Sequence, residues 1–118
     1  MTTTTQLAIT IPPDQIRSAG EPVFPQLRGR LFGYHEAMLL DLVNAREAYG
    51  VAKYGQTLMS DDGRDTPTEI INEMIDMLAY MTKLQMQSPS HLFEYRLSQA
   101  IALSVQVLEV LQDMEAQR

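Results

Sequence analysis

The sequence predicts an all-α fold, a helical bundle with an irregular N-terminal arm. Apolar residues recur every three or four positions through most of residues 31–118, which is the period of a helix. Four of the six prolines fall within residues 1–30, where they argue against a long helix. We therefore expect an irregular arm over 1–30 and one all-α domain over 31–118. A chain of 118 residues buries a modest core, so we expect oligomerisation to complete the bundle.

The composition excludes several classes of function. The formal net charge of −6 disfavours general binding to nucleic acids or to anionic membranes. The sequence has no cysteine, which excludes disulfide, thiolate–zinc and cysteine-nucleophile chemistry. Its apolar runs are too short to cross a bilayer, and the N-terminus carries no targeting pattern. We expect a cytoplasmic protein, in the host cytoplasm if a phage encodes it, with no nucleic-acid or membrane partner.

A first long helix is predicted from Gly33 to Tyr54, with Gly55 as its C-terminal stop. On the helical wheel, Glu36 and Glu47 share an arc with the apolar residues Leu40 and Val43. A helix that packs through this arc turns Glu47 inward.

An inward carboxylate is costly unless a cation or a hydrogen-bond donor meets it. Two partners for Glu47 are open, namely a metal ion or a salt bridge to Lys83 or Arg64. Asp41 lies on the opposite side of the wheel, where we expect it to face solvent.

Two further helices follow. One begins at Thr66 and continues to about Gln87, with Pro67 at its first turn and a T-x-x-E capping box formed by Thr66 and Glu69. The other runs from His91 to Ala116 and is apolar on several sides. Such a helix is typical of the centre of a bundle or of a subunit interface.

Acidic and polar residues form a narrow stripe along one flank of the 66–87 helix. Glu73 and Asp76 are its central pair, at E-x-x-D spacing, and carboxylate oxygens are ligands that Mg²⁺ prefers. The alternative is a solvated face in which Glu69 caps the helix and Lys83 is the counter-charge. The stripe consists of Glu69, Glu73, Asp76, Tyr80 and Lys83.

Cationic and aromatic residues surround these carboxylates in the sequence. Arginine and lysine bind phosphate oxygens, and aromatic rings stack on a base or bond a sugar. Taken singly, each is more often an ordinary surface or packing residue. The residues are Arg46, Lys53 and Arg64, with His35, Tyr49 and Tyr54.

Residues 45–84 resemble the MazG-like branch of the all-α nucleoside triphosphate pyrophosphohydrolases. The resemblance is carried by A-R at 45–46, K-Y-G followed by leucine at 53–58, G-R-D at 63–65 and E-x-x-D-x-x-x-Y at 73–80. It implies a helical bundle that forms a homodimer or homotetramer. It also implies Mg²⁺-dependent hydrolysis of ribo- or deoxyribonucleoside triphosphates to a nucleoside monophosphate and pyrophosphate, with Mn²⁺ as the substitute ion.

The resemblance also assigns roles to residues. Glu47, Glu73 and Asp76 are the implied catalytic and metal-binding groups, because the family uses an E-x-x-E pair and an E-x-x-D pair. Asn44 replaces the first glutamate of the former pair, which removes one negative charge. Asn44, Glu36 and Glu69 are the further candidate ligands. The expected substrate contacts are Arg46, Lys53, Tyr54, Arg64, Tyr80 and Lys83.

Other functions are also consistent with the sequence. A relative that binds or sequesters nucleotides with weakened catalysis is favoured by Asn44. An oligomeric helical interaction module is favoured if the acidic stripe is simply solvated. Phosphoribosyl-ATP pyrophosphohydrolase has a similar E-x-x-D pattern, but this sequence shows no sugar-phosphate contacts of that enzyme.

Overall fold

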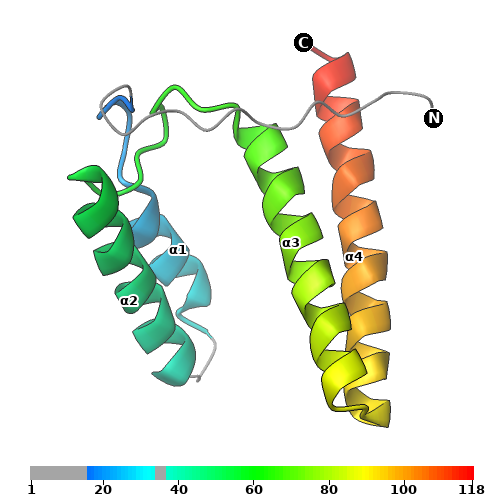
Figure 1. Ribbon diagram of the computed structural model, residues 1–118. Helices are drawn as coiled ribbons and strands as arrows, with labels where there is room; N and C mark the ends of the chain where they lie inside the picture. The colour runs from blue at the N-terminus through cyan, green and yellow to red at the C-terminus, as the bar shows by residue number, and fades with distance from the viewer. Residues whose placement is uncertain (1–15, 34–36) are drawn as a thin grey trace. The chain divides into compact units, whose positions relative to one another are not determined.

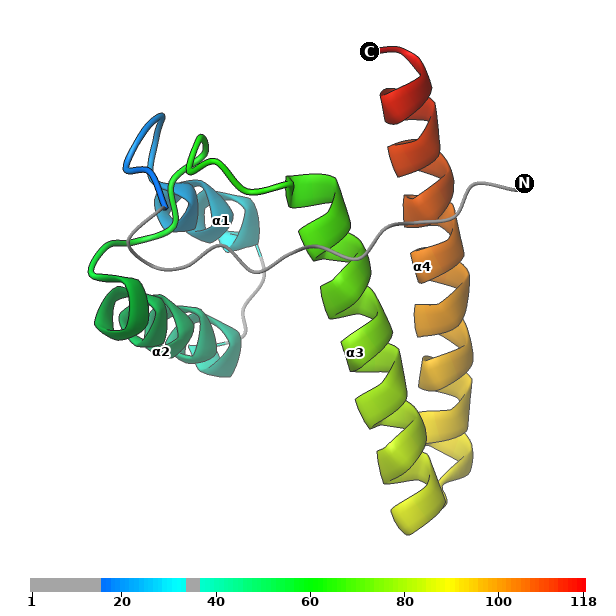
Figure 2. The ribbon, with the colours of Figure 1, turned by 45° about the horizontal axis from the view of Figure 1, so that its top comes forward.

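The computed structural model describes residues 16–33 and 37–118. Within these residues the chain forms four α-helices and no β-strand, which confirms the all-α fold class (Figure 1). The helices are α1 (Val23–Leu31), α2 (Ala37–Tyr54), α3 (Thr66–Gln87) and α4 (His91–Ala116). Of the described residues, 16–33 and 37–64 belong to one compact unit and 65–118 to another. Helix α1 contacts α2 in the first unit, and α3 packs along α4 in the second (Figures 1 and 2).

Helix α1 corrects the expectation of an irregular arm. It lies mostly within residues 1–30, so the prediction is wrong for residues 23–30, whereas residues 1–15 lie outside the described part of the chain. Pro25 occupies the first turn, where its missing N–H leaves no hydrogen bond unmade. The partly buried residues of α1 recur at the spacing of one helix face; they are Val23, Phe24, Leu27, Arg28 and Leu31.

Helix α2 ends where the sequence predicts. Gly55 has a φ of +78°, and its N–H donates to the carbonyl of Val51 over 2.8 Å. A residue with a side chain is strained at this φ, so glycine suits the position. The predicted start at Gly33 precedes residues 34–36, which are outside the described residues, and the described helix begins at Ala37.

The loop after α2 is held by the segment that precedes α1. The N–H of Val23 donates to the carbonyl of Leu58 over 2.8 Å, and the N–H of Ser60 donates to the carbonyl of Glu21 over 2.8 Å. Gly20 has a φ of +82°, and a Cβ built there would collide with the Ser60 hydroxyl. The loop is therefore tied to the segment before α1 by backbone hydrogen bonds.

The bounds of α3 and α4 match the sequence prediction, but the N-cap of α3 does not. Asp65, not Thr66, is the cap: its carboxylate accepts from the N–H of Thr68 at 3.4 Å and from the Thr68 hydroxyl at 2.8 Å. The proposed capping box of Thr66 and Glu69 is therefore wrong. Helix α4 is capped by Ser90, whose hydroxyl accepts from the N–H of Phe93.

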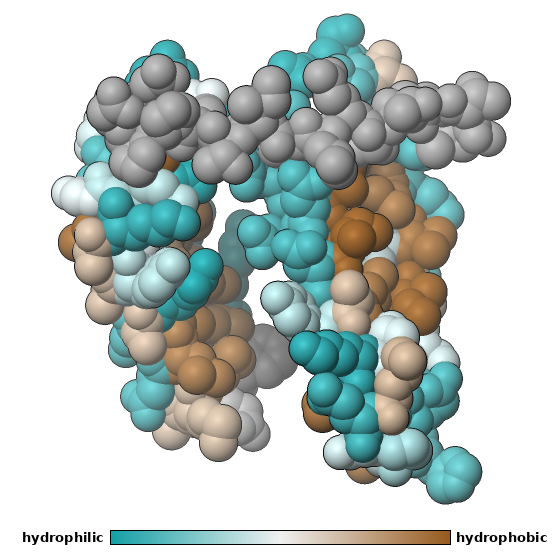
Figure 3. All heavy atoms as spheres, in the orientation of Figure 1, coloured by the Kyte–Doolittle hydropathy of each residue, from teal (hydrophilic) through white to brown (hydrophobic). Residues whose placement is uncertain are grey.

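The α3–α4 hairpin leaves much apolar surface uncovered. Among the described residues, Leu97 is the one buried hydrophobic residue, and it is still 6% exposed. Apolar residues gather on the surface of this hairpin in the space-filling view (Figure 3). The exposed large hydrophobic residues of α4 include Leu92, Leu103, Val105, Val110 and Met114.

No helix in the described part of the chain combines the length and the hydropathy needed to cross a bilayer.

Two substitutions at the start of α3 distinguish capping by Asp65 from the predicted capping box of Thr66 and Glu69. Asp65→Ala should lower the free energy of unfolding by about 1 kcal/mol, because it removes both cap hydrogen bonds. Thr66→Ala is the matched control and should stay within about 0.5 kcal/mol of wild type. Chemical unfolding followed by circular dichroism measures both. The reverse ranking would support the capping box.

Candidate functional site

Glu47 lies on the packed face of α2, as its wheel position predicts. Leu40, Val43 and Glu47 are all partly buried, whereas Asp41 is exposed, which confirms the predicted arc. The Glu47 side chain is 22% exposed. An inward carboxylate of this kind needs donors, and the structure supplies two.

The two donors to Glu47 come from α1 and from the loop after α2. Nη2 of Arg28 donates to Oε1 of Glu47 and forms an ion pair with it. The hydroxyl of Thr57 donates to Oε2 over 2.7 Å. Both carboxylate oxygens of Glu47 are therefore engaged.

Arg28 also reaches Asn44, one helical turn before Glu47. Its Nε donates to Oδ1 of Asn44 over 2.9 Å. The guanidinium thus spans Asn44 and Glu47, the two positions that correspond to the E-x-x-E motif in the resemblance. Of the two expected salt-bridge partners of Glu47, Arg64 is corrected here, because it pairs with Asp62 instead. A bridge to Lys83 stays a prediction, because Lys83 belongs to the other unit.

These contacts shift the pKa of Glu47. The hydrogen bond from Thr57 is the largest cause and lowers the pKa, partial desolvation opposes it, and the hydrogen bond and charge of Arg28 lower it further. The carboxylate is thereby held ionised, and a lowered pKa makes Glu47 a weaker proton acceptor.

A second cluster combines two cations with one aromatic ring. Arg64 lies 4.7 Å from the centre of the Tyr54 ring, and Lys53 Nζ lies 5.2 Å from it. Contacts of this length are cation–π interactions, and they hold the charges close together. The structure therefore unites three of the expected substrate-contact residues. Arg46, the fourth in this unit, lies over Tyr49 at 4.6 Å instead.

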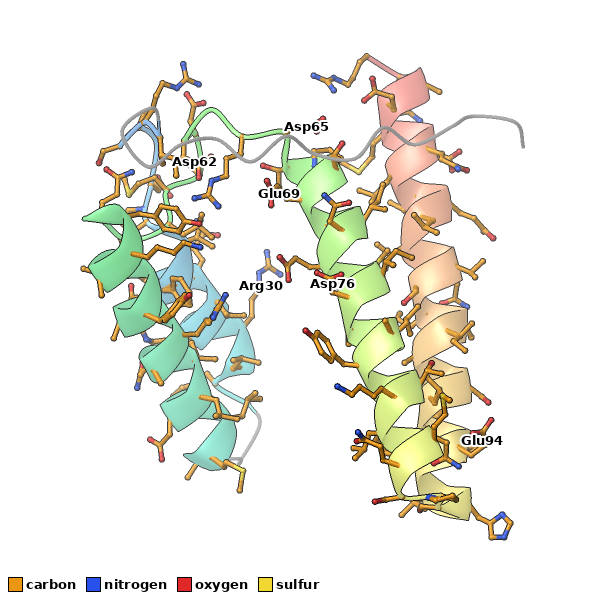
Figure 4. All side chains as sticks on the ribbon, viewed as in Figure 1. Arg30, Asp62, Asp65, Glu69, Asp76 and Glu94 are labelled. Atoms are coloured by element: carbon orange, nitrogen blue, oxygen red, sulfur yellow. The ribbon has the colours of Figure 1, made fainter. Side chains whose placement is uncertain are left out.

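Buried Asp62 fixes Arg64. It is 5% exposed, and its carboxylate accepts from the N–H of Arg64 at 3.1 Å and pairs with Nε at 3.4 Å. Figure 4 labels Asp62 in the loop before α3. The hydrogen bond to the N–H two residues later is an Asx turn, which D-G-R could have indicated. Sequence reasoning missed Asp62, and it also missed Arg28 and Thr57.

The carboxylates of α3 are placed differently from Glu47. Because α3 is continuous, Glu69, Glu73 and Asp76 share one flank, and Figure 4 shows Glu69 and Asp76 on the same side of the helix. Glu73 and Asp76 are exposed, and no hydrogen bond or ion pair joins either side chain to another described residue. Tyr80 and Lys83 continue the flank and are exposed.

The donor sets on α2 and α3 therefore differ in their fit to a divalent cation. Glu73 and Asp76 present free carboxylate oxygens one turn apart, which suits Mg²⁺ with additional ligands from substrate phosphates. Asn44 and Glu47 already bind Arg28 and Thr57 through the oxygens that a metal would use.

A metal shared by Glu47, Glu73 and Asp76 stays a prediction, because Glu47 is in one unit and the other two are in the second. Within residues 16–33 and 37–118, the structure shows no group of three or more histidine, aspartate or glutamate side chains placed to hold a metal ion. Candidate ligand Glu36 and aromatic candidate His35 lie outside the described residues.

Comparison of the chain with protein-family models, with curated proteins and with solved structures finds no match.

The lowered pKa of Glu47 predicts a specific pH dependence of stability. A depressed pKa in the folded state stabilises the protein above the ordinary glutamate range, and this stabilisation disappears as the pH falls through the lowered value. Glu47→Gln should therefore lower the melting temperature at pH 7 and lose that effect progressively towards pH 3.

The matched control is Asp41→Asn, an exposed carboxylate on the opposite side of α2. Its melting temperature should track wild type at every pH. A difference between Glu47→Gln and wild type that is constant from pH 7 to pH 3 would contradict the contacts described here.

Proposed function

We propose that this protein is a Mg²⁺-dependent nucleoside triphosphate pyrophosphohydrolase that releases a nucleoside monophosphate and pyrophosphate. The observation that carries the proposal is the Lys53–Tyr54–Arg64 cluster, which gathers two positive charges on one ring in an acidic chain. The resemblance of residues 45–84 to the MazG-like family supports the same reaction.

The proposed metal-binding residues are Glu73 and Asp76 on α3. Two exposed carboxylates without a cationic partner repel one another, and a divalent ion relieves that repulsion. Such an ion would offset the charge of the phosphates and would lower the pKa of a water bound to it. Tyr80 and Lys83 lie further along the same flank and are proposed to contact the nucleotide.

The proposed phosphate-binding residues are Lys53 on α2 and Arg64 in the loop after it. Arg64 presents a planar fork that suits phosphate oxygens, and its ion pair with Asp62 restricts its conformations. Lys53 adds a second charge beside the same ring. Arg46 is an exposed cation on α2 and is proposed to contact the substrate from there.

The reaction proceeds at the α-phosphorus. A bond would form from a water oxygen to this atom while the bond from it to the α–β bridging oxygen breaks, so that pyrophosphate leaves and the proton lost by the water passes to solvent. Lys53 and Arg64 would bind the outer phosphates and stabilise the negative charge that develops on the leaving group. Glu47 is not the proposed proton acceptor, because its pKa is lowered.

A second candidate function is nucleotide binding with weakened catalysis. The specific observation in its favour is that Arg28 donates hydrogen bonds to both Asn44 and Glu47. These residues stand where the family has its E-x-x-E pair, so a side chain already engages the positions that would bind a metal. This candidate predicts Mg²⁺-dependent nucleotide binding without release of pyrophosphate.

Pyrophosphate release tests the proposed reaction. We expect release from at least one canonical ribo- or deoxyribonucleoside triphosphate, and only with Mg²⁺ or Mn²⁺. Glu73→Gln and Asp76→Asn should each reduce kcat by about 10²- to 10³-fold, the scale of losing one preorganised electrostatic contact. Glu109→Gln, an exposed carboxylate on α4, is the control and should retain wild-type kcat.

Turnover at the wild-type rate by Asp76→Asn would overturn the assignment of this site. Binding without release selects the second candidate. The absence of any thermal shift with Mg²⁺ and nucleotide would instead favour the interaction module.

We further propose that a second copy of the chain covers the exposed seam of α4. Leu103, Val107, Val110 and Met114 recur at intervals of four and three, the spacing of a coiled-coil seam. Leu103 is 61% exposed and Val110 is 56% exposed. Among the described helices, only α3 approaches the 26-residue length of α4, so a second α3–α4 hairpin matches it in length and forms a four-helix bundle.

Sedimentation tests this pairing. Wild type should sediment as a dimer or tetramer, and Val110→Asp should shift the mass towards the monomer because it places a charge in the apolar seam. Ser98→Asp, an exposed polar position on α4, is the control and should keep the wild-type mass. A monomeric wild type would contradict the proposal.

A further inference from the structure

We propose that the guanidinium of Arg28 takes the place of a metal ion between Asn44 and Glu47, so that this part of α2 is a fixed-cation site. The inference deepens the proposed function, because it confines metal binding to Glu73 and Asp76. It rests on the contacts that Arg28 makes inside the unit formed by residues 16–33 and 37–64.

The geometry is that of one cation spanning two acceptors on a helix. Nε of Arg28 donates to Asn44 Oδ1 at 2.9 Å, and Nη2 donates to Glu47 Oε1. Thr57 donates to the remaining Glu47 oxygen at 2.7 Å. The carbonyl and carboxylate oxygens that could ligate a metal on this turn are the same atoms that accept these hydrogen bonds.

The charges are balanced without an ion. Asn44 is neutral and Glu47 carries one negative charge, which the single positive charge of Arg28 matches. With a glutamate at position 44, the pair would carry two negative charges, which a divalent ion would match better. The asparagine and the arginine are therefore mutually consistent, since each reduces the need for a metal at this turn.

Displacing Arg28 would be unfavourable. The Arg28 side chain is 34% exposed and lies on the face of α1 that packs against α2. A metal ion that bound Asn44 and Glu47 would leave this partly buried guanidinium without hydrogen-bond acceptors. Metal binding here would also break the contacts between these helices that Arg28 makes. The residues therefore do not fit a divalent ion in this arrangement.

Counting bound Mn²⁺ by electron paramagnetic resonance on the full chain tests the inference. Glu47→Gln should leave the wild-type count unchanged, because Glu47 is not a ligand. Arg28→Gln should add one Mn²⁺ per chain, and Arg28→Gln combined with Glu47→Gln should remove that gain.

Two controls isolate the role of the guanidinium. Arg30→Gln removes a positive charge from an exposed position on the same helix, labelled in Figure 4, and should keep the wild-type count. Arg28→Lys keeps a cation at the site and should also keep that count. Circular dichroism checks the helical content of each variant.

Loss of an ion in Glu47→Gln would overturn the inference, because it would make Glu47 a ligand. An unchanged count in Arg28→Gln would overturn it as well. Failure of the proposed function has a separate signature: Glu73→Gln combined with Asp76→Asn would leave the wild-type count unchanged. If wild type bound no Mn²⁺ at all, the proposed function would fail, and the Arg28→Gln result would still decide the inference.

Discussion

The partly buried carboxylate of Glu47 is the constraint on which the first unit depends. An ionised group on a packed helix face must meet donors, and here they come from α1 and from the loop after α2. The contacts of Glu47 with Arg28 and Thr57 therefore join three segments that are apart in the sequence. The loop that contains Thr57 also carries Asp62 and Arg64. The hydrogen bond from Thr57 to Glu47 therefore helps to position the loop whose Arg64 lies over Tyr54.

The carboxylate of Glu47 on α2 and those of Glu73 and Asp76 on α3 lie in different electrostatic environments. On α2 the carboxylate is neutralised by a side chain of the protein, and its pKa is lowered. On α3, Glu73 and Asp76 are exposed, and no cation among the described residues pairs with them. Because of this contrast we propose that a divalent ion binds to α3 and that fixed positive charge lies at α2 and its loop.

Local signals in the sequence predicted most of the helices. Pro67 and the S-P-S break mark the ends of α3 and the start of α4, and Gly55 ends α2 because its left-handed φ suits glycine. Helix α1 was not predicted, because the prolines in residues 1–30 argue against a helix. Pro25 is nevertheless tolerated, since it lies in the first turn of α1. Asp65 and Thr66 are adjacent residues that both cap helices well, so composition alone could not choose between them.

The helical wheel of α2 predicted that Glu47 turns inward. It could not predict which donors meet the carboxylate, because Arg28 and Thr57 reach it only through tertiary packing.

An anomalous-scattering map of crystals grown with Mn²⁺ and a non-hydrolysable nucleoside triphosphate tests most directly whether the divalent ion binds at α3. We expect a Mn²⁺ peak in coordination range of Glu73 and Asp76, with phosphate oxygens completing its shell. A peak between Asn44 and Glu47, with Arg28 displaced, would contradict it.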